Sequence, residues 1–573
     1  MLPASSEPGI SHPVLFVRRA GERALLVELA GPAGAAALHS RLQADPLPGQ
    51  TGLVPAACTV LVRLATPAHA RQAAGLLAEL ELRAADRAGQ AGLVELDTVY
   101  DGEDLAEVAR LTGLGSADAV AEAHSAAVWT AAFCGFAPGF AYLTGGDPRL
   151  DVPRRAEPRT AVPAGAVALA GAYSAAYPGS SPGGWQLIGR TSAPLWDLDR
   201  EQPALISPGA TVRFRPVREQ LALRQRPAAA LHTAAAPISG ERTIPGEHTV
   251  AGTPGPPPAA VVLDPGLQST IQDLGRPGYS HVGVGRSGAA DRSALVRANR
   301  MVGNPAGAAG LEVLFGGLRL RAERDLVVAA TGASTPLALQ AADRPERPAP
   351  FDAPFLLRAD EVLSLGPPAA GLRTYLAVRG GLAGEPVLGS QSTDTLAGLG
   401  PEPLTAGRGL GVGPEPGTAV GLPEPAPPLP GTEAGTEAGT EAGTEAGAGT
   451  ETDVQLRYIP GPREDWFDAA GLDGFASRTW TAAQDSNRVG IRFSGEPLTG
   501  RRSGELESEA VLPGAVQVPP SGLPILFLAD APVTGGYPVI GVVVQADLDL
   551  AAQLRPGTSV RFTPVLPPEE LRG

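Results

Sequence analysis

The sequence contains no lysine, so all 45 basic side chains are arginine. This absence excludes several kinds of chemistry, because a Walker-type phosphate loop, a biotin carrier and a Schiff-base enzyme each depend on a lysine amine. A phosphate bound by this chain must therefore be held by arginine, by backbone N–H groups or by a metal ion.

Cysteine and long apolar runs are also scarce. The two cysteines are Cys58 and Cys134, and no charged-then-apolar leader is visible at the start of the sequence. This pattern favours neither a disulfide framework nor secretion. No stretch approaches the roughly 18 apolar residues that a membrane span needs. We therefore expect a soluble, cytoplasmic protein.

Basic residues are fewer than acidic ones. The formal net charge is -15, from 45 basic and 60 acidic side chains, and no basic cluster interrupts the pattern. A polyanion such as DNA would be repelled overall, so we expect no nucleic-acid partner. A chain of 573 residues is too long for one ordinary core and indicates roughly three to five domains.

Two stretches are typical of linkers. Residues 218–258 are rich in Ala, Pro and Gly without periodicity. Residues 421–451 run from Pro-rich sequence into GTEAGTEAGTEAGTEAG, which has little apolar surface to offset the entropy of ordering. A helix is disfavoured there because each glycine costs about 1 kcal/mol relative to alanine. We expect residues 421–451 to be disordered.

The two parts of the chain repeat one another. VPAGAV at Val162–Val167 matches VLPGAV at Val511–Val516, and Gly183–Trp185 matches Gly535–Tyr537 at nearly the same offset. Around these matches, short apolar runs alternate with Pro and Gly, which is typical of closed or sandwiched β structure. The repeat predicts two related β barrels.

The fold class is therefore predicted to be mainly β with α+β: tandem barrels preceded by a small α+β domain. The predicted domains are a small α+β domain at 11–95, a barrel at 96–217, a β-rich domain at 259–420 and a second barrel at 452–567. The clearest expected helices span 68–83, 101–111, 117–125 and 291–302, the last with Asp291 as its N-cap.

A glycine motif precedes the expected helix at Asp291. Gly283, Gly285 and Gly288 match the G-x-G-x-x-G pattern, but the residues before them do not form a strand, so the dinucleotide fingerprint lacks its context. Two interpretations remain open. The glycine N–H groups, with Arg276 or Arg286 nearby, bind an anion at the helix start, or the loop is purely structural.

Three further residues carry reactive groups. His124 and Cys134 could form a nucleophile pair, although a buried thiol within FCGF is the commoner situation. His281 could titrate usefully or lie in a surface loop.

Longer motifs carry a family resemblance. In the first half these are FCGFAPGFAYLTGGDPRL from Phe133, VPRRAEPRTAVPAGAVALAG from Val152 and YPGSSPGGWQLIGRT from Tyr177. They resemble the B subunit of the bacterial three-part 5-oxoprolinase, a family also described as allophanate hydrolase subunit 1 and as a kinase inhibitor of sporulation. The second half opens with DPGLQSTIQDLGRPGYSHVGVGRSGAADRSALVRANRMVGN from Asp264 and is similar to the C subunit. That protein is also called allophanate hydrolase subunit 2, or biotin-dependent carboxyltransferase-like.

The resemblance implies a fold, a reaction and partners. It implies cyclophilin-like barrels in a fused B and C chain that uses ATP, with Mg²⁺, to phosphorylate the amide oxygen of 5-oxoproline. A separate A subunit would then complete ring opening to glutamate. It also implies a small-molecule substrate and possible homo-oligomerisation. The absence of lysine excludes covalent biotin on this chain, and the absence of long apolar runs predicts no membrane partner.

The candidate site residues follow from this chemistry, because a transferring phosphoryl group needs preorganised donors and only arginine is available here. As catalytic candidates we take His124, Arg276, Asp291 and Arg488. As substrate- or ATP-binding candidates we take Arg159, Trp185, Arg190, Gln272, Asp273, Arg286, Gln517 and Tyr537. Gln272, Asp273 and Asp291 would orient the arginines or hold the metal. For each residue a structural role is the alternative.

Two other functions stay open. The chain could be the carboxyltransferase part of a urea-carboxylase-like system, fed by carboxybiotin on a separate lysine-bearing protein. It could instead be a non-enzymatic regulator that binds a histidine kinase, as the sporulation name implies.

Overall fold

The computed structural model describes residues 13–82, 92–218 except 156, 258–429 except 427 and 428, and 453–565 except 501, 503 and 505. Nearly all of the expected linker 218–258 therefore lies outside the described residues, as does most of 421–451. The described start of that second segment packs on the preceding domain. Gly421 N donates to Met301 O, and Glu424 pairs with Arg300.

The small N-terminal domain is a four-stranded antiparallel sheet with two helices. The strand order is β1 (Val14–Arg19), β2 (Ala24–Leu29), β4 (Thr59–Leu64) and β3 (Gln50–Pro55), and the helices are α1 (Pro32–Ala44) and α2 (Pro67–Ala78). Because strand side chains alternate between faces, Val27 and Val62 pack on the helices, whereas Leu26 and Leu61 face the opposite side. Both faces of this sheet are therefore buried.

A closed seven-stranded barrel follows. Its strands are β5 (Leu93–Val99), β6 (Trp129–Cys134), β7 (Ala141–Thr144), β9 (Ala166–Ala170), β10 (Tyr173–Ala176), β12 (Gln186–Thr191) and β13 (Thr211–Pro216). A two-stranded ribbon of β8 (Arg159–Val162) and β11 (Ser181–Gly183) lies beside it, and α3 (Leu105–Thr112) and α4 (Ala117–Ala126) pack on it. One pair, β13 with β5, is parallel.

The C-terminal domain is a second closed barrel with the same circular order. Its strands are β26 (Val454–Pro460), β27 (Trp480–Ala482), β28 (Gly490–Ser494), β30 (Ala515–Gln517), β31 (Ile525–Phe527), β33 (Val539–Val543) and β34 (Ser559–Pro564). The ribbon of β29 (Glu509–Ala510) and β32 (Thr534–Gly535) corresponds to β8 and β11, and β34 with β26 is the parallel pair. The tandem barrels predicted from the repeat are confirmed.

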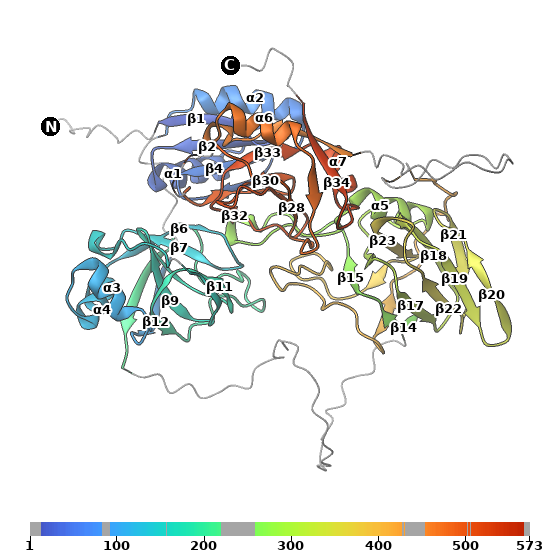
Figure 1. Cartoon of the computed structure of the whole chain (residues 1–573). Coiled ribbons are helices and arrows are strands. Elements are labelled where there is room, and N and C mark those ends of the chain that lie inside the picture. The colour runs from blue at the N-terminus through green and yellow to red at the C-terminus, as the bar shows by residue number, and fades with distance from the viewer. Residues whose placement is uncertain are drawn as a thin grey trace, which may run out of the picture.

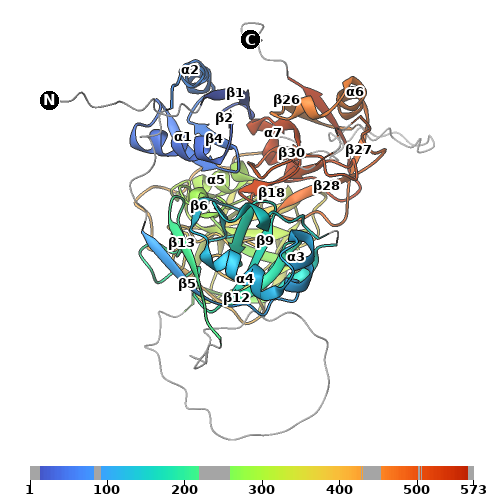
Figure 2. The ribbon, with the colours of Figure 1, turned by 90° about the vertical axis from the view of Figure 1, so that its left-hand side faces the viewer.

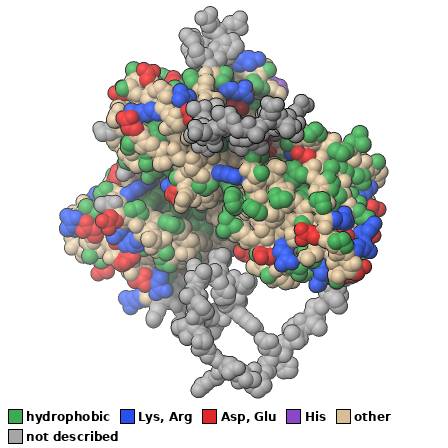
Figure 3. Space-filling view, turned by 45° about the vertical axis from the view of Figure 1, so that its right-hand side comes forward, with side chains coloured by type: hydrophobic (Ala, Val, Ile, Leu, Met, Phe, Trp, Pro, Cys, Tyr) green, Lys and Arg blue, Asp and Glu red, His purple; other side chains and the backbone are tan. Residues whose placement is uncertain are grey.

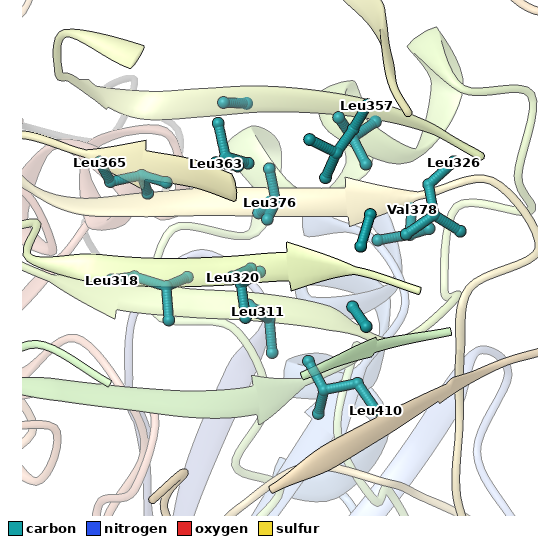
Figure 4. Packing of buried hydrophobic residues seen from close by; sticks show 14 of the residues in the cluster. Leu311, Leu318, Leu320, Leu326, Leu357, Leu363, Leu365, Leu376, Val378 and Leu410 are labelled. Carbon is teal, nitrogen blue, oxygen red and sulfur yellow. The ribbon is translucent and has the colours of Figure 1, made fainter. Parts of the chain in front are cut away.

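Between the barrels in sequence lies a domain of two facing sheets. One sheet has the order β20 (Arg344–Ala349), β19 (Leu337–Ala341), β22 (Val362–Leu365), β17 (Leu318–Ala322), β14 (Ala260–Pro265), β25 (Gly409–Val412) and β24 (Leu382–Ala383). The other has the order β15 (Gln268–Gln272), β16 (Gly310–Leu314), β23 (Ala370–Val378), β18 (Leu326–Ser334) and β21 (Pro354–Leu357). Leucines from both sheets meet in a dry core, as Figure 4 shows for Leu320, Leu363 and Leu376.

The helices agree in type with those expected from the sequence. Of the expected four, α2, α3 and α4 begin or end a few residues away from the predicted bounds, and α5 (Arg292–Met301) starts at the predicted N-cap, where Asp291 Oδ1 accepts from Ala294 N. Helices α1, α6 (Ala469–Ser477) and α7 (Gln545–Ala551) were not predicted from the sequence. In the described part of the chain, no helix is long and apolar enough to cross a membrane.

The four domains form two layers. Figures 1 and 2 show the small N-terminal domain and the second barrel together at the top, with the first barrel and the two-sheet domain below them. The small domain contacts its own barrel through Ala57 and also packs on the other half of the chain. Leu26 and Leu61 lie against Ala510 and Val533 of the second barrel.

Candidate anion-binding site at the junction of the two halves

A cavity of about 650 Å³ lies where the small domain, the start of α5 and the second barrel meet. Its wall comes from four segments: the turn between β1 and β2 with the end of β4, the loop 286–293, residues 512–513 with 527–529, and the region 542–549 that includes α7. The volume is in the range that proteins use for cofactor-sized ligands. Both halves of the chain are needed to enclose it.

Arg63 enters the cavity from the first half. It follows Leu61 by two residues on β4, so it lies on the same face of the sheet, which is turned towards the second half. In this register Arg63 pairs with Ala24, which also lines the cavity.

Arg286 and Arg292 enter from the second half and share one acceptor. Arg286 Nε and Arg292 Nη2 donate to the Leu274 carbonyl at 3.2 and 3.0 Å. Their loop is fixed at several points. Ser287 Oγ donates to Asp530 at 2.6 Å, and Ala290 N donates to Glu312 at 3.0 Å. The two guanidinium groups are thus held side by side before any ligand binds.

Positive charge is in excess here, because four arginines, Arg23, Arg63, Arg286 and Arg292, line the cavity together with the carboxylates of Glu22 and Asp549. Among the described residues, no side-chain carboxylate lies within 4.0 Å of the guanidinium nitrogens of Arg63, Arg286 or Arg292. Burial and the charge of Arg286 lower the pKa of Arg63, and burial with the same neighbour lowers that of Arg292 to about 10. An anion placed among these three groups would relieve this repulsion.

One carboxylate already lies at the start of α5. Asp549 Oδ1 accepts from the Arg292 N–H at 2.9 Å, and Asp549 Oδ2 accepts from the Ser293 hydroxyl. Burial and the charge of Asp549 raise the pKa of Asp291 to about 7. The start of α5 therefore already carries an anionic partner from another domain, which is consistent with the helix dipole favouring negative charge there.

One part of the cavity lining is apolar. Leu512, Pro513, Phe527 and Val542 line the side that belongs to the second barrel. Among the described residues, no group of three or more His, Cys, Asp or Glu side chains is arranged to hold a metal ion. The site combines a basic wall with an apolar wall, an arrangement suited to a ligand with an anionic end and an uncharged body.

Three predicted site residues come together behind this cavity. Asp273 accepts from the Ser390 and Ser392 hydroxyls, Gln272 Nε2 donates to the Thr393 carbonyl at 2.9 Å, and Arg276 is buried and donates to the Ser392 carbonyl. They fasten the loop after β15 to residues 390–393. None of the three lines the cavity, whereas the predicted residue Arg286 does.

Arg488 and Asp291 lie in buried networks between domains. Arg488 pairs with Asp530 of its own barrel at 2.9 Å and with Glu312 of the two-sheet domain, and it donates to the Gly288 carbonyl at 2.6 Å. Asp291 Oδ2 accepts from Gln553 at 2.7 Å. These contacts hold the cavity-lining loop from behind.

His124 lies in the core of the first barrel, on α4. Its ring nitrogens lie 2.8 Å from the Tyr100 hydroxyl and 2.7 Å from that of Ser174, and burial lowers its pKa to about 3. The ring centroid is 4.4 Å from that of Phe214. In the second barrel the same place holds Phe475, whose ring lies 4.6 Å from Phe562.

A tryptophan hydrogen bond found in both barrels shows that His124 and Phe475 occupy equivalent positions. Trp129 Nε1 donates to the His124 carbonyl, and Trp480 Nε1 donates to the Phe475 carbonyl, across five residues in both barrels. His124 thus occupies an aromatic core position of the repeat. Cys134 is buried and donates to the Ile206 carbonyl, and no described hydrogen bond joins it to His124.

The remaining candidates are dispersed. Arg159 pairs with Asp104 and Glu103, and Arg190 pairs with Asp101 on the surface. Trp185 is buried among aromatic side chains of the first barrel. Gln517 Nε2 donates to the carbonyl of Tyr537, whose side chain is exposed. Of the twelve candidates, only Arg286 lines the junction cavity.

The glycine motif permits close packing of the loop. Gly288 has φ +96°, and a Cβ there would lie 2.8 Å from Gly275 N; at Gly283 it would lie 2.4 Å from the Ala137 carbonyl of the first barrel. The same loop presents Arg286 to the cavity. Both features that the sequence suggested, tight packing and a basic side chain near the helix start, are thus present.

Arg63 and Arg292 were not among the residues predicted from the sequence. Arg292 follows the predicted N-cap directly, so its place in the first helical turn was a usable signal. Arg63 carried no such signal, because only the docking of the small domain on the other half brings it to the site.

Comparison with known proteins matches both halves. Residues 282–564 match the family model "Carboxyltransferase domain, subdomain A and B", and residues 15–206 match "Carboxyltransferase domain, subdomain C and D". The chain is 35% identical over 301 residues to the 5-oxoprolinase C subunit of Escherichia coli K12, covering 52% of this chain and 89% of that protein. The chain belongs to the family of 5-oxoprolinase B and C subunits.

Two further relatives extend this assignment. The 5-oxoprolinase B subunit of Escherichia coli O157:H7 is 48% identical over 129 residues, which is 22% of this chain and 59% of that protein. The crystal structure of TTHA0988 superposes with a TM-score of 0.76 at 34% identity, covering 94% of this chain and 99% of the other. This member of the B and C family therefore has a solved relative that spans both halves.

Proposed function

We propose that the chain is the ATP-using component of a 5-oxoprolinase. In this proposal the amide oxygen of 5-oxoproline attacks the γ-phosphorus of ATP, a new O–P bond forms, the bond to the β-phosphate oxygen breaks and ADP leaves. On a separate A subunit one water then adds to the phosphorylated amide carbon and the ring C–N bond breaks, and a second water splits the resulting acyl phosphate into glutamate and phosphate. The family relationship supports the substrate.

The observation that carries the ATP step is the basic wall of the junction cavity. A phosphoryl transfer needs donors aimed at the phosphate oxygens, and in a lysine-free chain these must be guanidinium or backbone N–H groups. Arg63, Arg286 and Arg292 provide three such groups around one cavity, in which arginines outnumber the carboxylates of Glu22 and Asp549. Mg²⁺ would arrive with the nucleotide, which is its usual mode of binding.

The test is coupled turnover. The purified chain is mixed with an A-subunit homologue, ATP and Mg²⁺, and the release of ADP and glutamate is measured with 5-oxoproline and with L-proline, which lacks the ring carbonyl. We expect ADP and glutamate in equal amounts with 5-oxoproline and none with L-proline. Absence of 5-oxoproline-dependent ADP release would refute the proposal.

A carboxyltransferase component is the second candidate, because both matching family models are named for that domain. The lysine-free chain cannot carry biotin itself, so a separate biotinylated protein would be required. Transfer that avidin blocks, in place of ADP release with 5-oxoproline, would favour this function.

A further inference from the structure

The basic wall of the junction cavity is divided between the two halves of the chain. Arg63 belongs to the small N-terminal domain, and Arg286 and Arg292 belong to the loop and helix start of the second half. Phosphate oxygens form strong, charge-assisted hydrogen bonds with guanidinium groups. A ligand with several phosphates carries enough acceptor oxygens for the guanidinium groups of both halves.

A second part of the lining belongs to the second barrel. Leu512 and Pro513 follow β29 in sequence, Phe527 lies on β31 and Val542 lies on β33. All four residues line the cavity. An aromatic base packed here would be removed from water, while the phosphates attached to it would point towards the arginines.

We propose that this cavity is a nucleoside polyphosphate site built across the halves, with Arg63 on one side and Arg286 and Arg292 on the other contacting the phosphates. The choice of ATP as the nucleotide rests on the proposed function, but the polyphosphate site itself rests on the cavity and its charges. Neither half contains the complete site. The bound phosphates also hold the small domain against the second half.

Arginine substitutions in this site should leave the fold intact. Because burial and mutual repulsion disfavour the charged forms of Arg63 and Arg292 in the folded chain, replacing either one removes a buried charge without separating an ion pair among the described residues. We expect the thermal unfolding midpoints of Arg63→Ala and Arg292→Ala to be no lower than that of the wild type. Loss of binding in these variants would therefore report on the site.

The experiment measures binding to the full chain by calorimetry, with inorganic tripolyphosphate and with ATP as probes. We expect Arg63→Ala and Arg292→Ala each to weaken both ligands by about tenfold or more, since each removes charge-assisted hydrogen bonds. Leu512→Ala should weaken ATP and leave tripolyphosphate unchanged. Arg215→Ala and Arg492→Ala, which remove exposed arginines paired with Asp97 and Asp485, are the matched controls for the two halves.

Different outcomes overturn different statements. Unchanged binding in Arg63→Ala, with loss in Arg292→Ala, would confine the site to the second half and refute the composite site. Unchanged binding in both variants would place the phosphates elsewhere. If tripolyphosphate binds as expected but 5-oxoproline-dependent ADP release is absent, the proposed function fails while the polyphosphate site stands.

Discussion

At the scale of single residues, arginine has two distinct roles in this chain. Arg488 is buried between the carboxylates of Asp530 and Glu312, whereas Arg63 and Arg292 line a cavity and form no side-chain ion pair with any described residue. The residue type is the same, but the environment separates a group that holds domains together from groups available to a ligand. Candidate arginines can therefore be ranked by whether a carboxylate lies close enough to balance the charge of the guanidinium group.

Arg488→Ala is expected to destabilise the protein. It leaves Asp530 and Glu312 buried without their shared cation, a change that costs about 3 to 5 kcal/mol. The midpoint of urea unfolding should fall clearly in this variant and stay unchanged in Arg492→Ala, the exposed arginine on β28. A wild-type midpoint in Arg488→Ala would show that the network is dispensable, and any loss of turnover would then be catalytic.

His124 makes the first barrel sensitive to acid. Its folded-state pKa of about 3 lies below the ordinary value of 6.5, so below pH 6.5 the unfolded chain binds a proton that the folded chain does not. The stability present above pH 6.5 is therefore lost as the pH falls towards 3, by up to about 1.4 kcal/mol per pH unit. Urea unfolding followed by tryptophan fluorescence should show a lower midpoint at pH 5.5 than at pH 7.5.

The second barrel suggests the matched variant. His124→Phe introduces the residue found at the equivalent position, Phe475, and removes the titrating group. We expect a shallower pH dependence in this variant, even though the hydroxyls of Tyr100 and Ser174 lose their shared partner. An equal pH dependence in the two proteins would assign the acid sensitivity to other groups.

At the scale of elements, the sequence predicted the helices and strands whose apolar residues recur at regular spacing. The repeated apolar runs predicted the barrels, and Asp291 before an amphipathic run predicted α5 with its cap. Helix α1 was missed because its sequence, PAGAAALHSRLQA, has neither a side-chain cap nor a clear apolar stripe. Helix α7 is short and lacks a side-chain cap as well, so local rules had little to detect.

Helix α7 sets the charge at the start of α5. Asp549 places a carboxylate beside the Arg292 N–H, within the basic cavity. Because this charge repels an incoming phosphate, Asp549→Asn should bind tripolyphosphate several-fold more tightly than the wild type, while the amide oxygen can still accept the hydrogen bond. Calorimetry at low ionic strength measures the change.

The control for this prediction is Asp485→Asn, which removes an exposed carboxylate of the same barrel. It should leave tripolyphosphate affinity unchanged. Weaker binding in Asp549→Asn would contradict the repulsion and would instead indicate that Asp549 supports the ligand, for example through a metal ion.

At the scale of the whole molecule, the decisive contacts have no local sequence signal. The small domain precedes the first barrel in sequence and packs also on the second, and that docking brings Arg63 to the cavity (Figures 1 and 2). Periodicity predicts which residues of β4 share a face, but it does not predict what covers the face. This is why Arg286 was found among the candidates and Arg63 was not.

Charge is mixed on the surface of the molecule that Figure 3 shows. On the face shown in Figure 3, acidic and basic side chains are interspersed and no area of one sign dominates. Together with the net charge of -15, this disfavours nucleic acid.

The extent of the contact between the halves predicts that the covalent link is dispensable. Glu28 of the small domain pairs with Arg463 of the second barrel at 2.9 Å, and Leu26 packs beside Val533. A protease site placed within residues 219–257 would allow the covalent link between the halves to be cut after folding. We expect the cut protein to elute as one species at micromolar concentration and to keep its tripolyphosphate affinity.

The matched variant for this cleavage is Leu26→Glu, which puts a charge into the apolar contact between the halves, where burying an unpaired charge is strongly unfavourable. Before cleavage its first barrel should unfold as in the wild type; after cleavage the halves should separate on size-exclusion chromatography and tripolyphosphate binding should disappear. Separation of the wild-type halves would show that the interface is too weak to complete the site without a linker. Retained binding by an isolated half would show that one half alone provides the phosphate contacts.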